Sequence, residues 1–170
     1  VDLLVSRESS STLGVLLGNG NGSFATGSSR YAGTRPMGLA AVRVDGNDTL
    51  DLLVALAGDG SVASLGGDGA GGLGFPLVSA VGGSPIALVA ERLDADTALD
   101  VALIDAARNT VAILRGSGVG TFLPGSTVEV GVAPATIRAA DLDQDGILDL
   151  IVPCTFSHDL WVLRGNELVP

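Results

Sequence analysis

An aspartate that opens a short apolar run recurs along this chain every 49 residues. It occupies positions Asp2, Asp51, Asp100 and Asp149. Two further markers keep the same spacing: a Gly-x-x-Pro motif, and a glycine that ends an apolar run. The Gly-x-x-Pro motif begins at Gly33, Gly82 and Gly131, and the other glycines are Gly18, Gly67, Gly116 and Gly165. Agreement of three markers indicates an internal repeat, and a period near fifty is typical of propellers and repeat arrays.

Each repeat contains four short runs with the character of β-strands. In the third repeat we expect strands over 86–91, 100–104, 110–115 and about 121–130, with a loop over 92–99. The connecting segments are rich in Gly, Asn, Asp and Ser, which favour turns. No helical periodicity is present. Four strands per repeat suit one blade of a β-propeller.

The first two strands of each repeat have different compositions. The first strand is rich in small residues, which are favoured where the innermost strands of blades crowd a central axis. The second is apolar on both faces, as expected for a strand covered by neighbouring blades. A β-solenoid and an ordinary sandwich are alternatives, but a solenoid coil is usually shorter than this repeat and a sandwich needs no period. The sequence therefore predicts an all-β propeller of four-stranded antiparallel blades.

The chain of 170 residues holds about three and a half repeats, at approximately 1–36, 37–85, 86–134 and 135–170. It opens at a second strand and ends after a third one. Rings commonly close with about four to eight blades, so segment 1–170 is expected to form part of a ring. Further blades, from a parent chain or from another copy, would cover its open edges. The start in mid-repeat without Met suggests a processed or partial product.

The fourth repeat carries an acidic loop directly before its second strand. Four carboxylates, at Asp141, Asp143, Asp145 and Asp149, fall within nine residues and repel one another unless a cation intervenes. Calcium suits a flexible set of carboxylate oxygens, and Gly146 permits a tight turn. An EF-hand is excluded for two reasons. The twelfth position of an EF-hand loop requires a bidentate Glu, and this sequence has Val152 there. Residues 148–152 also resemble a buried strand. This pattern predicts a calcium loop that leads into a strand.

With this loop and repeat, the sequence resembles the FG-GAP/VCBS repeat family of integrin-α-type β-propellers. The family pattern is an acidic calcium loop, an Asp-Leu-hydrophobic-Val run, and a strand ending in Leu-Gly-Asn-Gly-x-Gly-x-Phe. Residues 141–152 and 15–24 carry these pieces, 114–122 repeats the second, and the resemblance covers nearly the whole chain. It implies that the loop joins the first and second strands of a blade and binds Ca²⁺. The implied ligands are the side chains of Asp141, Asp143, Asp145 and Asp149 and the carbonyl of Ile147.

The equivalent loops of the two preceding repeats depart from this pattern. Arg43 and Arg92 stand where the fourth repeat has Asp141. The remaining candidates are Asp45, Asn47 and Asp51 in one loop and Asp94, Asp96 and Asp100 in the other. A guanidinium group can replace a metal by bidentate pairing with such groups. Both loops are therefore predicted to be metal-free and closed by arginine. The first repeat retains only Asp2.

Composition and motifs exclude several functions. The net charge of −10 disfavours nucleic acid as a partner. The uncharged stretch 69–90 contains prolines and glycines and lies inside the repeat, so membrane insertion is not expected. The glycine-rich runs lack the lysine of a P-loop. Cys154, Ser157, His158 and Asp159 fall within one expected turn, with no separate oxyanion donor implied, so no catalytic residues are predicted.

The favoured function is a calcium-stabilised binding or adhesion module, secreted or at the cell surface, whose loops contact a protein or a glycan. The alternatives are a carbohydrate-binding lectin and an accessory propeller domain of a secreted polysaccharide-active enzyme. The calcium ion is expected to stabilise its loop rather than to contact the ligand. All nine basic residues are arginine, which indicates a bacterial source with GC-rich DNA.

Overall fold

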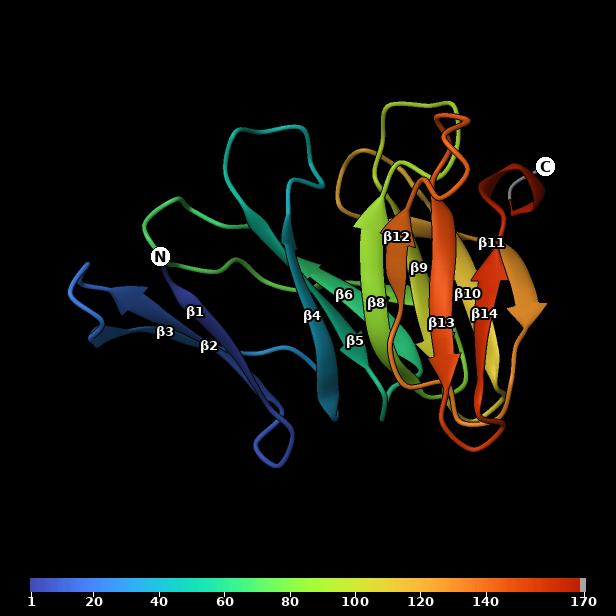
Figure 1. Ribbon diagram of the computed structural model, residues 1–170. Helices are drawn as coiled ribbons and strands as arrows, with labels where there is room; N and C mark the ends of the chain where they lie inside the picture. Colours follow the sequence, from blue (N-terminus) through green and yellow to red (C-terminus); the bar gives the residue numbers. More distant parts are fainter. Residues whose placement is uncertain (169–170) are drawn as a thin grey trace.

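The computed structural model describes residues 1–168 and contains fourteen β-strands in four antiparallel sheets (Figure 1). The strands are β1 (Leu3–Arg7), β2 (Thr12–Gly18), β3 (Phe24–Tyr31), β4 (Pro36–Val42), β5 (Asp51–Leu56), β6 (Ser61–Leu65), β7 (Leu77–Ala80), β8 (Pro85–Glu91), β9 (Asp100–Asp105), β10 (Thr110–Gly116), β11 (Phe122–Glu129), β12 (Arg138–Ala140), β13 (Asp149–Cys154) and β14 (Asp159–Leu163). The only helical element within residues 1–168 is a 3₁₀ turn at Gly165–Glu167. The last two residues of the fourth predicted repeat lie outside the described part of the chain.

The sheets follow the chain in order, each with its strands in sequence order. Their orders are β1-β2-β3, β4-β5-β6-β7, β8-β9-β10-β11 and β12-β13-β14. This arrangement confirms the all-β fold and the expected succession of three strands, two complete blades and three strands. The two complete sheets begin at Pro36 and Pro85, where prolines start the first strands. The structure is a partial, propeller-like array rather than a closed barrel.

The hydrophobic cores lie between successive sheets. Leu53 packs with Leu103 between the second and third sheets, and Ile104 packs with Leu150 between the third and fourth. A smaller cluster joins the first and second sheets. Every residue of β5 and β9 is buried, as the apolar pattern on both faces predicted. Each fully buried leucine or isoleucine contributes roughly 1.5–3 kcal/mol, so these faces hold the sheets together.

The first strands approach one another closely. β8 lies between β4 and β12 (Figure 1) and contacts both. A Cβ atom on Gly38 in β4 would lie 2.8 Å from the Cα atom of Ala87 in β8, which is closer than side-chain atoms pack. Small residues are therefore required where these strands meet. This explains the composition that the sequence shows at the first strand of each repeat.

The aspartates that recur every 49 residues play the same hydrogen-bonding role in their sheets. Asp100, only 1% exposed, accepts the N–H of Gly116 at 2.9 Å and the N–H of Leu93 at 3.1 Å. Burial, followed by repulsion from Asp94 and Asp96, raises the pKa of Asp100 against the effect of these two hydrogen bonds. The equivalent bonds to the recurring glycines are Asp2 to Gly18, Asp51 to Gly67 and Asp149 to Gly165. We call this the Asp–Gly contact.

The glycine in each Asp–Gly contact has no room for a side chain. A Cβ atom on Gly67 would collide with the carbonyl oxygen of Leu50, the residue before Asp51. The same collision would occur at Gly18, Gly116 and Gly165 with the residue before the corresponding aspartate. The 49-residue spacing of both markers therefore arises from one contact, which joins the start of the second strand to the end of the third.

We predict that Gly67→Ala lowers the free energy of unfolding by about 1–3 kcal/mol, because the added methyl group forces Leu50 away and weakens the hydrogen bond to Asp51. The adjacent residue supplies a matched control, since a Cβ atom on Gly66 would meet nothing closer than 3.9 Å. Gly66→Ala should leave stability within about 0.5 kcal/mol. Urea unfolding of both variants measures the difference. Equal stabilities would show that the close approach is not required.

Candidate metal centre and neighbouring loops

The loops between the first and second strands project from the same end of the sheets. They span residues 43–50, 92–99 and 141–148, and all rise at the top of Figure 1. Each loop ends at the buried aspartate of an Asp–Gly contact. The sheets therefore place all three sequence-predicted loops side by side, on frames that are equivalent from one repeat to the next.

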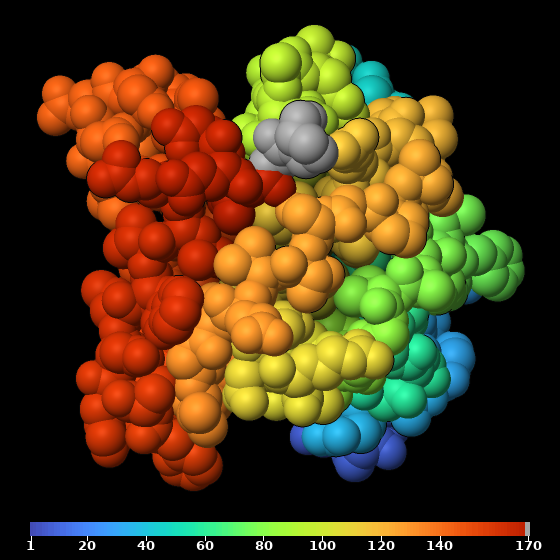
Figure 2. All heavy atoms as spheres, turned by 90° about the vertical axis from the view of Figure 1, so that its right-hand side faces the viewer, coloured from blue at the N-terminus to red at the C-terminus, as the bar shows by residue number. Residues whose placement is uncertain are grey.

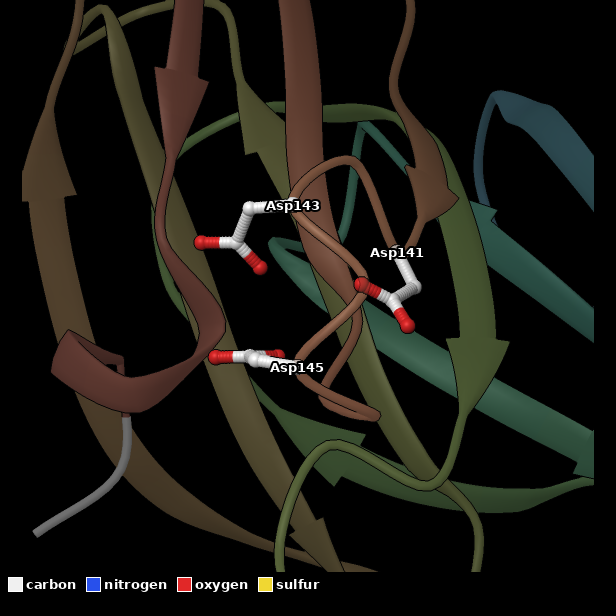
Figure 3. A group of neighbouring side chains, drawn as sticks. All are labelled: Asp141, Asp143 and Asp145. Carbon is white, nitrogen blue, oxygen red and sulfur yellow. The ribbon is translucent and has the colours of Figure 1, made fainter.

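The loop between β12 and β13 brings three carboxylates together. Oxygen atoms of Asp141, Asp143 and Asp145 all lie within 4.8 Å of one another, and the three side chains are exposed (Figure 3). The backbone holds this arrangement, because Gly146 donates its N–H to Asp141 Oδ2 at 3.0 Å and Ile147 donates its N–H to Asp145 Oδ1 at 2.8 Å. Gly146 adopts the φ of 87° that the turn requires.

These three carboxylates form a donor set that fits a hard divalent cation. All the donors are oxygen atoms, and exposure leaves room for water to complete a shell of six to eight ligands. The nearest cation is Arg164, whose Nη1 lies 3.7 Å from Asp143 Oδ2. One exposed guanidinium group offsets only part of the repulsion among three carboxylates. The loop can therefore hold a metal ion through Asp141, Asp143 and Asp145.

The structure places Asp149 differently from the other three predicted side-chain ligands. Asp149 is 4% exposed, and its two oxygens accept the N–H groups of Leu142 at 3.1 Å and Gly165 at 3.0 Å. It is not a member of the carboxylate group. Its observed role is the Asp–Gly contact at the base of the loop. Ile147 lies within the loop, and coordination by its carbonyl stays a prediction, as does coordination by Asp149.

The loop over residues 43–50 is closed by hydrogen bonds that the sequence did not predict. Asn47 Nδ2 donates to Asp45 Oδ2 at 2.8 Å, and Arg43 Nε donates to the backbone carbonyl of Asp48 at 3.0 Å. Asp51 already accepts two backbone N–H groups. Asp45 and Asp51 have other donors, and Arg43 spans the loop through a carbonyl oxygen instead. The predicted bidentate pairing of Arg43 is therefore corrected.

The loop over residues 92–99 is held without its arginine. Asp94 accepts the N–H of Asp96 at 2.9 Å, and Asp96 accepts the N–H of Ala98 at 2.8 Å. Asp100 is buried in its Asp–Gly contact. Arg92 forms no ion pair and no hydrogen bond with any residue from 1 to 168. The predicted arginine pairing is absent here too, while the prediction that both loops are metal-free stays a prediction.

A large cleft lies between these two arginine loops and not at the three carboxylates. It has a volume of about 990 Å³, and Arg43 and Arg92 both line it. Leu50, Leu99 and Leu148 also line it. The sequence analysis missed this cleft, although these lining residues share the 49-residue spacing that defined the repeats.

The group around His158 has ordinary structural contacts. Burial raises the pKa of the Cys154 thiol, which is 2% exposed. Ser157 Oγ donates to Asp159 Oδ1 at 2.7 Å, and this hydrogen bond is the first cause that lowers the pKa of Asp159. Ser157 Oγ also accepts the N–H of Val132. The hydroxyl group is thus engaged by Asp159 and the backbone.

Comparison with known proteins agrees with this architecture. A profile of the FG-GAP-like repeat matches residues 92–152. A search of curated proteins found no match. A crystal structure of a functionally unknown protein from Desulfotomaculum acetoxidans DSM 771 is similar with a TM-score of 0.76 at 17% sequence identity, over 98% of this chain and 52% of the other. This chain therefore spans about half the length of that structure. Within residues 1–168, no helix has the length and apolar character needed to cross a membrane.

We predict that Ser157→Ala raises the pKa of Asp159 toward the ordinary aspartate value, because the carboxylate loses its hydroxyl donor. A lowered pKa in the folded state adds stability above the unfolded-state pKa, and this contribution is lost as pH falls through the folded-state pKa. The variant should therefore lose less stability than the parent protein in that acidic range. Carboxyl ¹³C titration by NMR measures the pKa, with Ser10→Ala as the control. An unchanged pKa of Asp159 in Ser157→Ala would show that the Ser157 hydroxyl does not lower it.

Proposed function

We propose that this chain, which carries an FG-GAP-like repeat over residues 92–152, is part of a calcium-stabilised β-propeller that binds a protein or glycan partner and has no catalytic activity. The observation that carries the proposal is the group formed by Asp141, Asp143 and Asp145 at the loop end of rigid sheets. Rigid scaffolds commonly present binding residues on such loops.

Calcium is the cation that best suits this group. Its ligands are oxygens at flexible geometry, whereas Mg²⁺ requires near-ideal octahedral geometry. Asp141, Asp143 and Asp145 would hold the ion, and the ion would supply charge neutralisation that keeps the loop in one conformation. An exposed site of this kind suits the calcium levels outside cells, where modules bind at about 10⁻⁴–10⁻³ M. This supports a secreted or cell-surface location.

The outer sheets support the presence of further blades. β14 exposes Leu160, Trp161 and Val162, and β1 exposes Leu3 and Leu4. Figure 2 shows the atoms of the C-terminal sheet, in red, along the left edge of the molecule. Apolar faces of this kind are normally covered. We propose that blades from the parent chain or from another copy cover them, as successive sheets do within the array.

A lectin is the second candidate, because several aromatic side chains are exposed. Phe75 is 82% exposed, and the Arg30 guanidinium lies 4.7 Å from the centre of its ring. Tyr31 is also exposed. Exposed rings offer apolar faces on which a sugar ring can stack. A glycan array distinguishes this candidate, since binding that Phe75→Ala abolishes would identify a lectin.

We predict that calcium binds at one site per chain and stabilises the fold by about 2.7 kcal/mol at a calcium concentration 100 times Kd. Asp143→Asn should weaken binding about tenfold or more, because the site loses one of three negative charges. Asp94→Asn is the matched control, since Asp94 occupies the equivalent position in the loop of Arg92. Its affinity should equal that of the parent protein.

Calorimetric titration gives the number of sites, and thermal unfolding with and without a chelator gives the stabilisation. The proposal fails if calcium leaves the melting temperature unchanged. Two equal sites, one of them lost in Asp94→Asn, would show that the arginine loops also bind metal.

A further inference from the structure

The cleft between the arginine loops has the size of a ligand site. Its volume of about 990 Å³ lies at the upper end of the range of about 300–1,000 Å³ that is usual for ligand pockets. Residues of the second and third sheets line it together with Leu148 from the loop before β13, so it crosses the junctions between blades. Binding sites commonly form where separate structural units meet.

The apolar part of the cleft includes three leucines whose backbone positions are fixed by the Asp–Gly contacts. Leu50, Leu99 and Leu148 each precede the aspartate of an Asp–Gly contact, and the recurring glycines pack on their carbonyl oxygens. Leu50 is nevertheless 56% exposed. Ala41 and Ala90, from the adjoining first strands, also line the cleft. The backbone thus holds an apolar surface in place before any ligand arrives.

The cationic part of the cleft is provided by Arg43 and Arg92, which are the only cationic side chains that line it within residues 1–168. The bond from Arg43 Nε to the carbonyl of Asp48 orients its guanidinium group and leaves the terminal nitrogens available. Arg92 has no ion-pair or hydrogen-bond partner within residues 1–168. Guanidinium groups recognise carboxylates by paired, parallel hydrogen bonds.

Two acidic residues, Glu91 and Asp96, also line the cleft. Asp96 accepts the N–H of Ala98 in its own loop, and neither residue forms an ion pair with Arg43 or Arg92. The net charge of −10 on the chain repels strongly acidic proteins at long range. The cleft therefore suits a short segment with one or two carboxylates, rather than an acidic domain.

We propose that this cleft binds an acidic peptide segment of a partner protein. An apolar side chain of the segment packs on Leu50, Leu99 and Leu148, while a carboxylate pairs with Arg43 and Arg92. A peptide is favoured over a glycan because, in the described part of the chain, no aromatic side chain lines the cleft to stack on a sugar ring. This assignment rests on the proposed binding function and names the site and the chemistry of its ligand.

A random heptapeptide display library, selected in calcium on the immobilised 170-residue chain, tests the assignment. Enriched peptides should combine Asp or Glu with Leu, Ile or Val, and should bind Arg92→Glu at least tenfold more weakly. Arg115→Glu is the control, because Arg115 is exposed on β10 and does not line the cleft. Both variants should keep the circular dichroism spectrum and urea midpoint of the parent, since Arg92 and Arg115 are exposed and Arg92 has no ion pair to lose.

The remaining outcomes separate this inference from the general binding function. Enriched peptides without carboxylates, or peptides that Arg92→Glu binds normally, overturn the cleft assignment and leave the binding module in place. If no peptide is enriched and oligogalacturonate binds in a manner that depends on Arg92, the ligand of the cleft is an acidic glycan and the peptide proposal is overturned. Failure to bind both the peptide library and a glycan array contradicts both proposals.

Discussion

The organisation of this array depends on a buried carboxylate that accepts backbone N–H groups from two separate segments. A buried charge is costly unless it is hydrogen-bonded, and the buried Asp51, Asp100 and Asp149 each accept two such N–H groups. One donor lies at the start of the preceding loop and the other at the end of the third strand. This buried carboxylate therefore fixes both ends of its loop relative to its sheet. Because it recurs every 49 residues, successive loops begin from equivalent frames.

On these equivalent frames, the residue at the first position of each loop contributes to a difference in chemistry. Asp141 allows three carboxylates to approach one another, whereas arginine at the equivalent positions adds a cation beside the neighbouring cleft. The backbone bonds of Asp94 and Asp96 persist in the loop of Arg92. Loop conformation and loop charge are thus separable here: turns formed by aspartate hydrogen bonds hold the shape, and the first residue of the loop sets the charge.

Much of the fold was predictable because its causes are periodic. The strand pattern, the four sheets and the crowding at Gly38 all follow from composition that repeats with the chain. The approach of Asp141, Asp143 and Asp145 followed from their alternation within one tight loop. The place of Asp149 was less predictable, because spacing alone does not show that its oxygens already accept two backbone N–H groups. The same limitation explains why the predicted pairing of Arg43 with Asp45 was wrong, because spacing does not show that Asn47 donates to Asp45.

The only cysteine of the chain, Cys154, lies in β13 of the sheet that follows the acidic loop. Burial disfavours the thiolate, which is the form that attacks oxidants and other thiols. An intermolecular disulfide between two copies would therefore require β13 to detach first. The fraction of covalent dimers in an oxidised preparation would therefore report the fraction of molecules in which β13 had detached. The thiol of Cys154 can thus be used to measure local unfolding of the fourth sheet.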